Sequence, residues 1–320
     1  MSAIQFDQVS LQFPGAARPA VDQCSCEIST GRLVVILGPS GCGKTTLLKM
    51  VNRLYEPTSG KIYLNGQDIR QVKVTQLRQQ IGYVIQQSGL FPHMTVAQNV
   101  AVVPKLLGWS RSRIQARIDE LLTLVQLPPQ EYRDRYPAQM SGGQQQRVGL
   151  ARALAGDPAV MLMDEPFGAI DAITRATLQD EVLRLQCQLQ KTILFVSHDV
   201  EEALRLGDRL LIMEKGQIVQ YDTPFNVLTR PANEFVYHLM GADDRVRQLG
   251  LLRVETAMQR SPGASLNGEP TVEQRDSLRN ALSLILKTGA KKLTVLDQGS
   301  PVGILTLEHI RDSATPNSVP

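Results

Sequence analysis

A glycine-rich segment between an apolar run and a helix-forming sequence constrains the fold more than any other feature of this chain. Leu33–Leu37 is a run of consecutive apolar residues, which is the length and pattern of a strand buried in a sheet. Residues 45–54 have the pattern of a helix. The glycine-rich segment and the first residues after it are Gly38, Pro39, Ser40, Gly41, Cys42, Gly43, Lys44, Thr45 and Thr46. A strand, a glycine-rich turn and a helix in this order predict an α/β fold with a phosphate-binding turn.

The glycine-rich segment matches the P-loop pattern, and its residue types explain why such a loop holds nucleotide phosphates. Glycines let the backbone curl until successive N–H groups point inward at phosphate oxygens. The start of the following helix adds unpaired donors and a partial positive charge. Lys44 supplies a point charge for the β- and γ-phosphates, and Thr45 supplies a hydroxyl for Mg²⁺. We therefore predict ATP and Mg²⁺ as ligands of this loop.

The rest of the N-terminal region alternates strand and helix patterns. Apolar strands are expected at residues 160–163 and 193–197, with a helix at residues 172–189 between them. Strands separated by helices predict a mostly parallel sheet that is covered on both faces. Three further patterns complete this region: two antiparallel strands at residues 4–11 and 21–28, a mainly helical stretch at residues 96–156 with breaks at Pro128-Pro129 and Pro137, and a hairpin at residues 209–221.

Two acidic residues follow the apolar strand at residues 160–163. Asp164 is placed to hold Mg²⁺, and Glu165 to polarise a water for attack on the γ-phosphate. His198 follows the apolar strand that comes next along the chain. A lone histidine at such a position is usually a surface or capping residue. Because parallel strands end at the same edge of a sheet, an imidazole there is also within reach of the γ-phosphate or the attacking water.

A second anion-binding helix start occurs at Met140-Ser141-Gly142-Gly143-Gln144, before a helical run. One chain offers this helix start no second phosphate, which indicates that a second copy supplies one. The segment resembles the signature motif of ABC ATPases, with Met140 in place of the usual leucine. In that family two ATPase domains hold two ATPs between them. The resemblance implies that Ser141, Gly142, Gly143 and Gln144 contact ATP across a dimer.

Other motifs of the same family follow in order along residues 1–240. Phe13 resembles the aromatic residue that stacks on adenine, although a role in a strand core fits it equally well. Gln86 matches the glutamine that links the nucleotide to the membrane subunits, and the resemblance implies a place for it in the catalytic site and among the Mg²⁺ ligands. Gly168–Asp171 resembles the loop that runs between the two ATP sites, and His198 matches the switch histidine. The implied fold has a RecA-like core, an antiparallel β subdomain and a helical subdomain that carries the signature.

Several short segments are similar to the ATPases of osmoprotectant importers. They are Asn52-Arg53-Leu54, Glu56–Gly60, Ile81–Gln86, Gly89–His93 and Pro231-Ala232-Asn233. Such ATPases drive uptake of glycine betaine, choline, carnitine or proline through a separate membrane permease, together with a solute-binding protein. The apolar residues Leu90, Phe91, Pro92 and Met94 are explained either by local core packing or by a groove that receives a helix of the permease.

The C-terminal region differs in character from the rest of the chain. Residues 251–314 resemble a single CBS module, an α+β unit, but His309 stands where that module usually has an aspartate for the nucleotide ribose. A packing role and a regulatory role are both open. Residues 261–271 have the composition of a loop or linker, and we expect them to separate the tail from the catalytic motifs. The predicted division is an ATP-binding domain at 1–241 and a linker with the CBS-like region at 242–320.

Composition narrows the class of partner. The net charge of +3 gives no argument for a nucleic-acid partner, and the chain has no apolar run of membrane-spanning length and no signal peptide. Four cysteines without a metal or disulfide pattern indicate reduced thiols. Together with the resemblance to importer ATPases, this leads us to expect a homodimeric ATPase, peripheral on the cytoplasmic face of the cell (inner) membrane, that powers solute import. The alternatives are an importer for another small solute, such as an amino acid, and a soluble ABC ATPase without a transport role.

Overall fold

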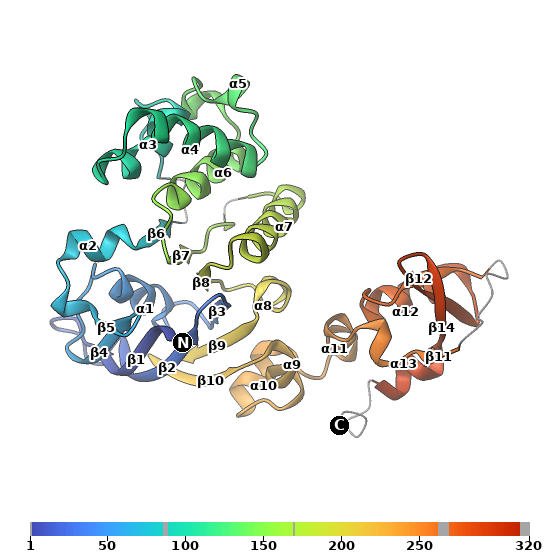
Figure 1. Ribbon diagram of the computed structural model, residues 1–320. Helices are drawn as coiled ribbons and strands as arrows, with labels where there is room; N and C mark the ends of the chain where they lie inside the picture. The colour runs from blue at the N-terminus through green and yellow to red at the C-terminus, as the bar shows by residue number, and fades with distance from the viewer. Residues whose placement is uncertain (1, 86–88, 169, 262–268, 314–320) are drawn as a thin grey trace. The chain divides into compact units, whose positions relative to one another are not determined.

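The computed structural model describes residues 2–85, 89–168, 170–261 and 269–313 (Figure 1). It divides the chain into two compact units, Met1–Asp222 and Thr223–Pro320. We predicted a domain boundary after residue 241, which is further along the chain than the division at Asp222. That boundary stays a prediction. No helix in the described part of the chain is both long enough and apolar enough to span a membrane.

The first unit is built on a six-stranded sheet in the order β10-β9-β3-β8-β7-β6. All neighbouring strands pair in parallel except β10, which forms an antiparallel hairpin with β9. The strands are β3 (Leu33–Leu37), β6 (Ile81–Val84), β7 (Val160–Asp164), β8 (Thr192–Val196), β9 (Arg209–Glu214) and β10 (Gln217–Asp222). Every residue of β3, β7 and β8 is buried, so the expectation of a parallel sheet covered on both faces is confirmed.

A second, antiparallel sheet has the order β2-β1-β4-β5. Its strands are β1 (Ser2–Leu11), β2 (Val21–Ser29), β4 (Ser59–Leu64) and β5 (Gln67–Asp68). Apolar residues alternate along β1, but Phe6 and Val9 are separated by two residues and not by one. The pairing register shifts at this point, and Gln8 has a φ of 47°. A bulge at this point inserts one residue and keeps the later apolar side chains on the buried face.

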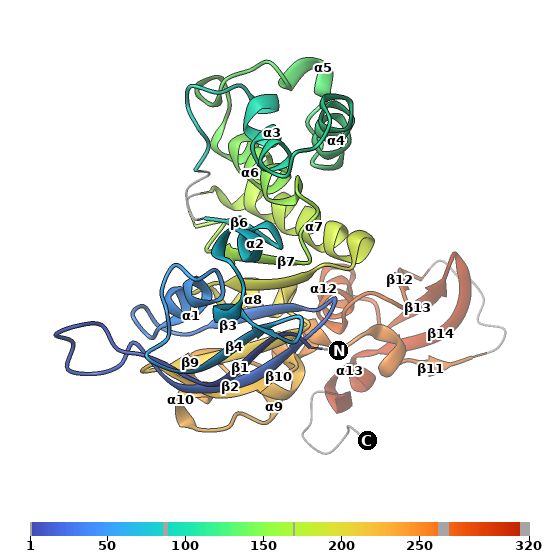
Figure 2. The ribbon, with the colours of Figure 1, turned by 60° about the vertical axis from the view of Figure 1, so that its left-hand side comes forward.

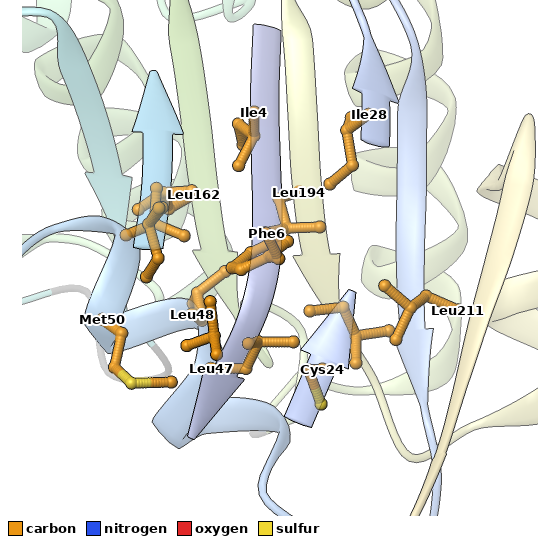
Figure 3. Packing of buried hydrophobic residues seen from close by; sticks show 14 of the residues in the cluster. Ile4, Phe6, Cys24, Ile28, Leu47, Leu48, Met50, Leu162, Leu194 and Leu211 are labelled. Carbon is orange, nitrogen blue, oxygen red and sulfur yellow. The ribbon is translucent and has the colours of Figure 1, made fainter. Parts of the chain in front are cut away.

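Helix α1 (Lys44–Val51) contributes Leu47, Leu48, Met50 and Val51 to a core that both sheets share. Figure 3 shows Leu47, Leu48 and Met50 with Ile4 and Phe6 of the antiparallel sheet and Leu162 and Leu194 of the parallel sheet. The helix was predicted to continue to Leu54 and ends earlier. Arg53 has a φ of 47°, a left-handed conformation that a helix does not contain.

The first unit has further α-helices besides α1. They are α2 (Val74–Gln79), α3 (Val96–Leu106), α4 (Arg111–Leu124), α5 (Pro129–Tyr132), α6 (Gly142–Leu154), α7 (Ala172–Leu189) and α8 (Val200–Leu206). Helices α3 to α6 pack together as a helical subdomain (Figure 2), and α6 also packs against β6. Helix α7 has the predicted bounds, and it begins there because the Asp171 side chain accepts the backbone N–H of Thr174.

The second unit contains its own four-stranded sheet, in the order β11-β14-β13-β12. Its elements are α9 (Pro224–Thr229), α10 (Glu234–Met240), α11 (Arg245–Leu251), β11 (Gln259–Arg260), β12 (Thr271–Glu273), α12 (Leu278–Thr288), β13 (Lys292–Asp297), β14 (Ser300–Thr306) and α13 (Leu307–Ser313). Residues 261–271, expected to separate the tail from the catalytic motifs, connect two strands of this sheet instead. That expectation is wrong, because Gln259 pairs with Ile304 before the segment and Thr271 pairs with Thr294 at its end.

Candidate functional site

The glycine-rich loop connects β3 to α1, and its backbone path leaves no room for side chains at two positions. Gly43 precedes the first residue of α1 with a φ of 104°, and a Cβ there would lie 2.3 Å from the carbonyl oxygen of Ala20. A Cβ at Gly38 would lie 2.3 Å from the carbonyl oxygen of Met213. Larger residues at either position would therefore displace the backbone. The loop is packed into this shape by its neighbours in the same unit.

Lys44 is held inside the loop. Its Nζ donates to the carbonyl oxygens of Gly38 at 2.8 Å and Pro39 at 2.9 Å, and its side chain is buried. Burying an ammonium group is unfavourable unless acceptors compensate for the lost water. The two carbonyls do so and fix the positive charge at the start of α1, where the helix adds its own partial positive charge. The arrangement provides a binding place for polyphosphate.

Asp164 and Thr45, 119 residues apart, meet at the carboxyl end of β7. The Thr45 hydroxyl donates to Asp164 Oδ1 at 2.8 Å. Burial raises the pKa of the Asp164 carboxyl, while the hydrogen bond from Thr45 and the charges of Lys49 and Lys44 act in the opposite direction. A hydroxyl and a carboxylate are oxygen donors of the kind that Mg²⁺ prefers. The two side chains therefore fit a magnesium ion shared with nucleotide phosphates.

Glu165 and His198 face one another at the same edge of the sheet. His198 Nδ1 lies 3.1 Å from Glu165 Oε2, and the imidazole is mostly exposed. Glu165 has a φ of 45°, and its backbone N–H donates to the carbonyl of Val196 on β8 at 3.1 Å. A non-glycine residue in this conformation is strained, and such residues often occur at functional sites. The carboxylate is thus placed beside Asp164, where it can accept a proton from a water.

The predicted signature residues lie at the start of α6. The Ser141 hydroxyl accepts the backbone N–H of Gln144, and the Gln144 side chain accepts the N–H of Ser141, a reciprocal capping box. Ser141 and Gly142 are exposed. Gly143 is buried, and a Cβ on it would lie 2.5 Å from Thr174 Cγ2 on α7. This helix start is therefore both fixed in place and accessible from outside the chain.

Phe13 lies beyond the end of β1 and is 37% exposed, so it is not a strand core residue. Its ring packs edge-to-face on Tyr55, with the centroids 5.2 Å apart. Tyr55 was not predicted, because no spacing in the sequence connects these two aromatic residues. Gln86 and Ala169 lie outside the described residues.

Comparison with known proteins places this site in a family. Residues 21–168 match the family model described as ABC transporter. The chain is 48% identical to the glycine betaine uptake system ATP-binding protein YehX of Escherichia coli (strain K12), across 97% of this chain and 98% of the relative. The chain belongs to the ATP-binding subunits of ABC import systems. It is also 47% identical to the glycine betaine/carnitine/choline transport ATP-binding protein OpuCA of Bacillus subtilis (strain 168), across 92% of this chain and 76% of the relative.

A solved structure gives the same fold for the ABC ATPase unit. It is a dimeric ATP-binding cassette in a post-hydrolysis state, bound to ADP and Pi, with 29% identity and a TM-score of 0.62. The match covers 69% of this chain and 98% of that chain. The ABC ATPase fold with its antiparallel β subdomain is therefore confirmed, while the CBS-like character of the second unit is not.

Cys42 gives a chemical test of where this ABC ATPase binds ATP. Its side chain is 3% exposed, burial raises the pKa of its thiol, and Sγ lies 4.0 Å from Lys44 Nζ. A maleimide should label the exposed Cys187 quickly and Cys42 slowly, because the thiolate is the reactive form. Labelled Cys42 should abolish ATP binding, measured with a fluorescent nucleotide on a Cys187→Ser background, and ATP should slow the labelling. Cys42→Ser is the control. Full ATP binding by a chain labelled at Cys42 would contradict this position for the site.

Proposed function

We propose that this ABC subunit hydrolyses ATP to drive import of quaternary-amine osmoprotectants such as glycine betaine, carnitine and choline. It would act as a homodimer, peripheral on the cytoplasmic face of the cell membrane, with a separate permease and, indirectly, a solute-binding protein. The observation that carries the catalytic part is the convergence of Lys44, Thr45–Asp164 and Glu165–His198 at one edge of the parallel sheet. The transported class is supported by the printed names of relatives that match nearly the whole chain.

The geometry supports hydrolysis by in-line attack of water on the γ-phosphate. Lys44 would neutralise the β- and γ-phosphate oxygens. Thr45 and Asp164 would hold Mg²⁺, which supplies further charge neutralisation at the phosphates. Glu165 would accept the proton of the attacking water, and His198, in contact with Glu165, would orient that water or the γ-phosphate. Asp164 ends β7, Glu165 and His198 lie in the loops after β7 and β8, and Lys44 and Thr45 begin α1, the helix that follows β3 and the glycine-rich loop.

A composite site in a dimer explains the accessible start of α6. Ser141 and Gly142 are exposed, although their residue types and capping box are those of an anion-binding helix terminus. A second copy that brings its own glycine-rich loop to this terminus would give each ATP contacts from both chains. The dimeric solved cassette supports pairing of this kind.

A groove beside the edge strand β6 supports docking of the permease. Its volume is about 340 Å³, and its lining includes Asn52, Tyr83, Phe91 and Arg152. Asn52 Oδ1 and the Tyr83 hydroxyl are buried and have no hydrogen-bond partner among the described residues. Phe91 is 40% exposed and Pro92 is exposed, so the core-packing explanation fails for these two residues. A groove that carries an exposed aromatic residue fits a partner helix that brings apolar side chains to it.

A fully buried asparagine fixes the loop that borders this groove. The Asn99 side chain donates to the carbonyls of Phe91, Met94 and Thr95 and accepts the backbone N–H of Phe91. These bonds hold Phe91 in place before any partner arrives, which lowers the entropy cost of association. The loop is thus a preformed contact surface.

Transport by the assembled system tests the proposal. The chain should co-purify with its membrane permease, and vesicles that contain the complex should accumulate radiolabelled glycine betaine only with internal ATP. Phe91→Glu should abolish co-purification while ATP binding stays within about twofold of wild type, because a charge is costly in an apolar contact. Lys105→Glu, on the surface of α3, is the matched charge control. Uptake of amino acids alone would favour the other importer class, and no membrane partner under any condition would favour a soluble ABC ATPase.

The second unit is proposed as a CBS-like module that regulates transport through contact between the tails of two chains. Its order of helix, strand, strand and helix supports this proposal. His309 Nδ1 accepts the backbone N–H of Thr306, and the Thr306 hydroxyl accepts the N–H of His309. The histidine thus serves as a local cap where the CBS pattern has a ribose-binding aspartate. We therefore favour ionic strength over an adenine nucleotide as the signal.

Removal of the tail should separate catalysis from regulation. A chain that ends at Gly241, or at Asp222 where the first unit ends, should still bind and hydrolyse ATP, because the catalytic residues and their core all precede Asp222. Transport into vesicles should change with internal salt for the full chain and not for the truncated chain, since salt screens exposed charge contacts. Identical salt responses would exclude the tail as the sensor.

A further inference from the structure

A buried carboxylate lies beneath the loop that carries His198. Ser197 is the first residue after β8 and is buried, and Glu202 on α8 is 7% exposed. The Ser197 hydroxyl donates to Glu202 Oε2, and the same hydroxyl oxygen accepts the backbone N–H of Asp199 at 3.0 Å. Ser197 is therefore bonded to the Glu202 carboxylate directly, and the backbone of Asp199 is bonded to it through the Ser197 hydroxyl. A buried carboxylate is unfavourable unless it is fully hydrogen-bonded, so this arrangement depends on its donors.

The second donor comes from α7, the helix that begins just after Asp171. Gln179 Nε2 donates to Glu202 Oε1 at 3.0 Å. Arg205 Nη1 donates to Gln179 Oε1 at 3.1 Å, which sets the orientation of the amide with its oxygen toward Arg205 and its nitrogen toward Glu202. Both carboxylate oxygens of Glu202 thus accept, and the loop after β8 is joined to α7 through an uninterrupted chain of hydrogen bonds.

A second link, nearer the surface, connects the loop around His198 to the first turn of α7. Arg175, in the first turn of α7, donates from Nη2 to the carbonyl of Ile170 at 3.0 Å. Its Nη1 lies 3.7 Å from Asp199 Oδ2. Asp199 also caps α8 by accepting the N–H groups of Glu201 and Glu202. The loop around His198 is therefore joined to α7 at two depths, and Arg175 also joins it to the carbonyl of Ile170 before α7.

We propose that Glu202 is a positioning residue for ATP hydrolysis, which holds the loop of His198 so that the imidazole stays against Glu165 and couples this loop to α7. Glu202 touches neither nucleotide nor water in this role and acts only through Ser197, Asp199 and Gln179. The inference rests on the proposed catalytic roles of Glu165 and His198. It adds a residue to that site and connects the site to α7.

The chemistry of the network requires a carboxylate opposite an amide. In a Glu202→Gln chain, an –NH₂ group would face either the –NH₂ of Gln179 or the hydroxyl hydrogen of Ser197, and either choice leaves a buried donor unpaired. Exchanging the two residues removes the conflict. With Gln179→Glu added, the new carboxylate accepts from residue 202 and also pairs with Arg205, while the amide oxygen at 202 accepts from Ser197.

The experiment compares Glu202→Gln, His198→Ala, their double variant and the exchanged pair Gln179→Glu/Glu202→Gln, each in the full chain assembled with its permease. Steady-state ATPase kinetics, nucleotide affinity and thermal unfolding are measured for each protein. Glu202→Gln should lower kcat at least about tenfold, with ATP affinity within about twofold of wild type. On the His198→Ala background the same change should have less than about a twofold effect, because the residue acts through the histidine. The exchanged pair should recover kcat to within about threefold of wild type.

Other outcomes overturn the inference in distinguishable ways. If Glu202→Gln and His198→Ala reduce kcat by independent factors that multiply, Glu202 does not act through the histidine. Failure of the exchanged pair to recover kcat while it unfolds at the wild-type temperature also refutes the proposed network. Full activity of His198→Ala would instead refute the proposed role of the histidine itself. Asp180→Asn is the matched control, because it breaks only the exposed 2.7 Å ion pair with Arg205, and it should leave kcat unchanged.

Discussion

Glu165→Gln should lower ATP turnover by about 10²- to 10⁴-fold, the usual contribution of a general base. A carboxamide keeps the shape of the side chain but cannot accept the proton of the attacking water. Lys44 and the Thr45–Asp164 pair are unaffected by the change, so ATP affinity should stay close to that of wild type. We expect ATP to hold the variant as a persistent dimer, because the step that separates the two chains no longer occurs.

The measurement combines single-turnover hydrolysis with size-exclusion chromatography in the presence of ATP. Glu201→Gln is the matched control, since it removes a carboxylate from the exposed first turn of α8, close in sequence to His198. Its turnover should equal that of wild type. Equal hydrolysis by Glu165→Gln and wild type would show that another group, or the γ-phosphate itself, takes the proton.

Lys44→Ala should act on affinity, because it deletes the charge that the loop holds ready for the phosphates. A hydrogen bond to a charged group contributes about 1.5–3 kcal/mol, which corresponds to a loss of roughly 10- to 150-fold in ATP affinity. Equilibrium binding of a fluorescent ATP analogue measures the loss. Lys61→Ala, on the exposed side of β4, is the control and should bind as wild type does. Unchanged affinity for Lys44→Ala would place the nucleotide elsewhere.

The same variant also tests whether the signature acts across a dimer. A chain with Lys44→Ala mixed with a chain carrying Ser141→Arg should form heterodimers in which one composite site is intact. Because Ser141 is exposed at the start of α6, arginine there should block the facing site without unfolding its own chain. We expect one ATP per heterodimer bound with near wild-type affinity, and only weakened binding in either variant alone. No binding in the mixture would mean that both motifs act within one chain.

Residue type and spacing alone were enough to predict several local elements of this protein. The strand at Leu33–Leu37 is entirely apolar, and Asp171 before residues 172–189 is a typical N-cap, so these elements have their predicted bounds. The glycine-rich loop was predictable for the same reason, since Gly43 has a backbone conformation and a neighbour that exclude larger residues. In each case residue types within a few positions indicate the conformation, although the neighbour of Gly43, the carbonyl of Ala20, is brought there by tertiary packing.

Contacts between side chains that are far apart in the sequence were determined only by the tertiary structure. The Thr45–Asp164 hydrogen bond, the Phe13–Tyr55 contact and the Glu202–Gln179 bond each depend on how strands and helices are ordered in space. The segment at 261–271 shows the same limit, because its polar composition is that of a linker and only strand pairing reveals it as a connection within one sheet. Composition and periodicity report the local conformational preference of the backbone. Strand order and the proximity of side chains arise when the whole chain packs together. Local conformational preferences therefore do not predict them.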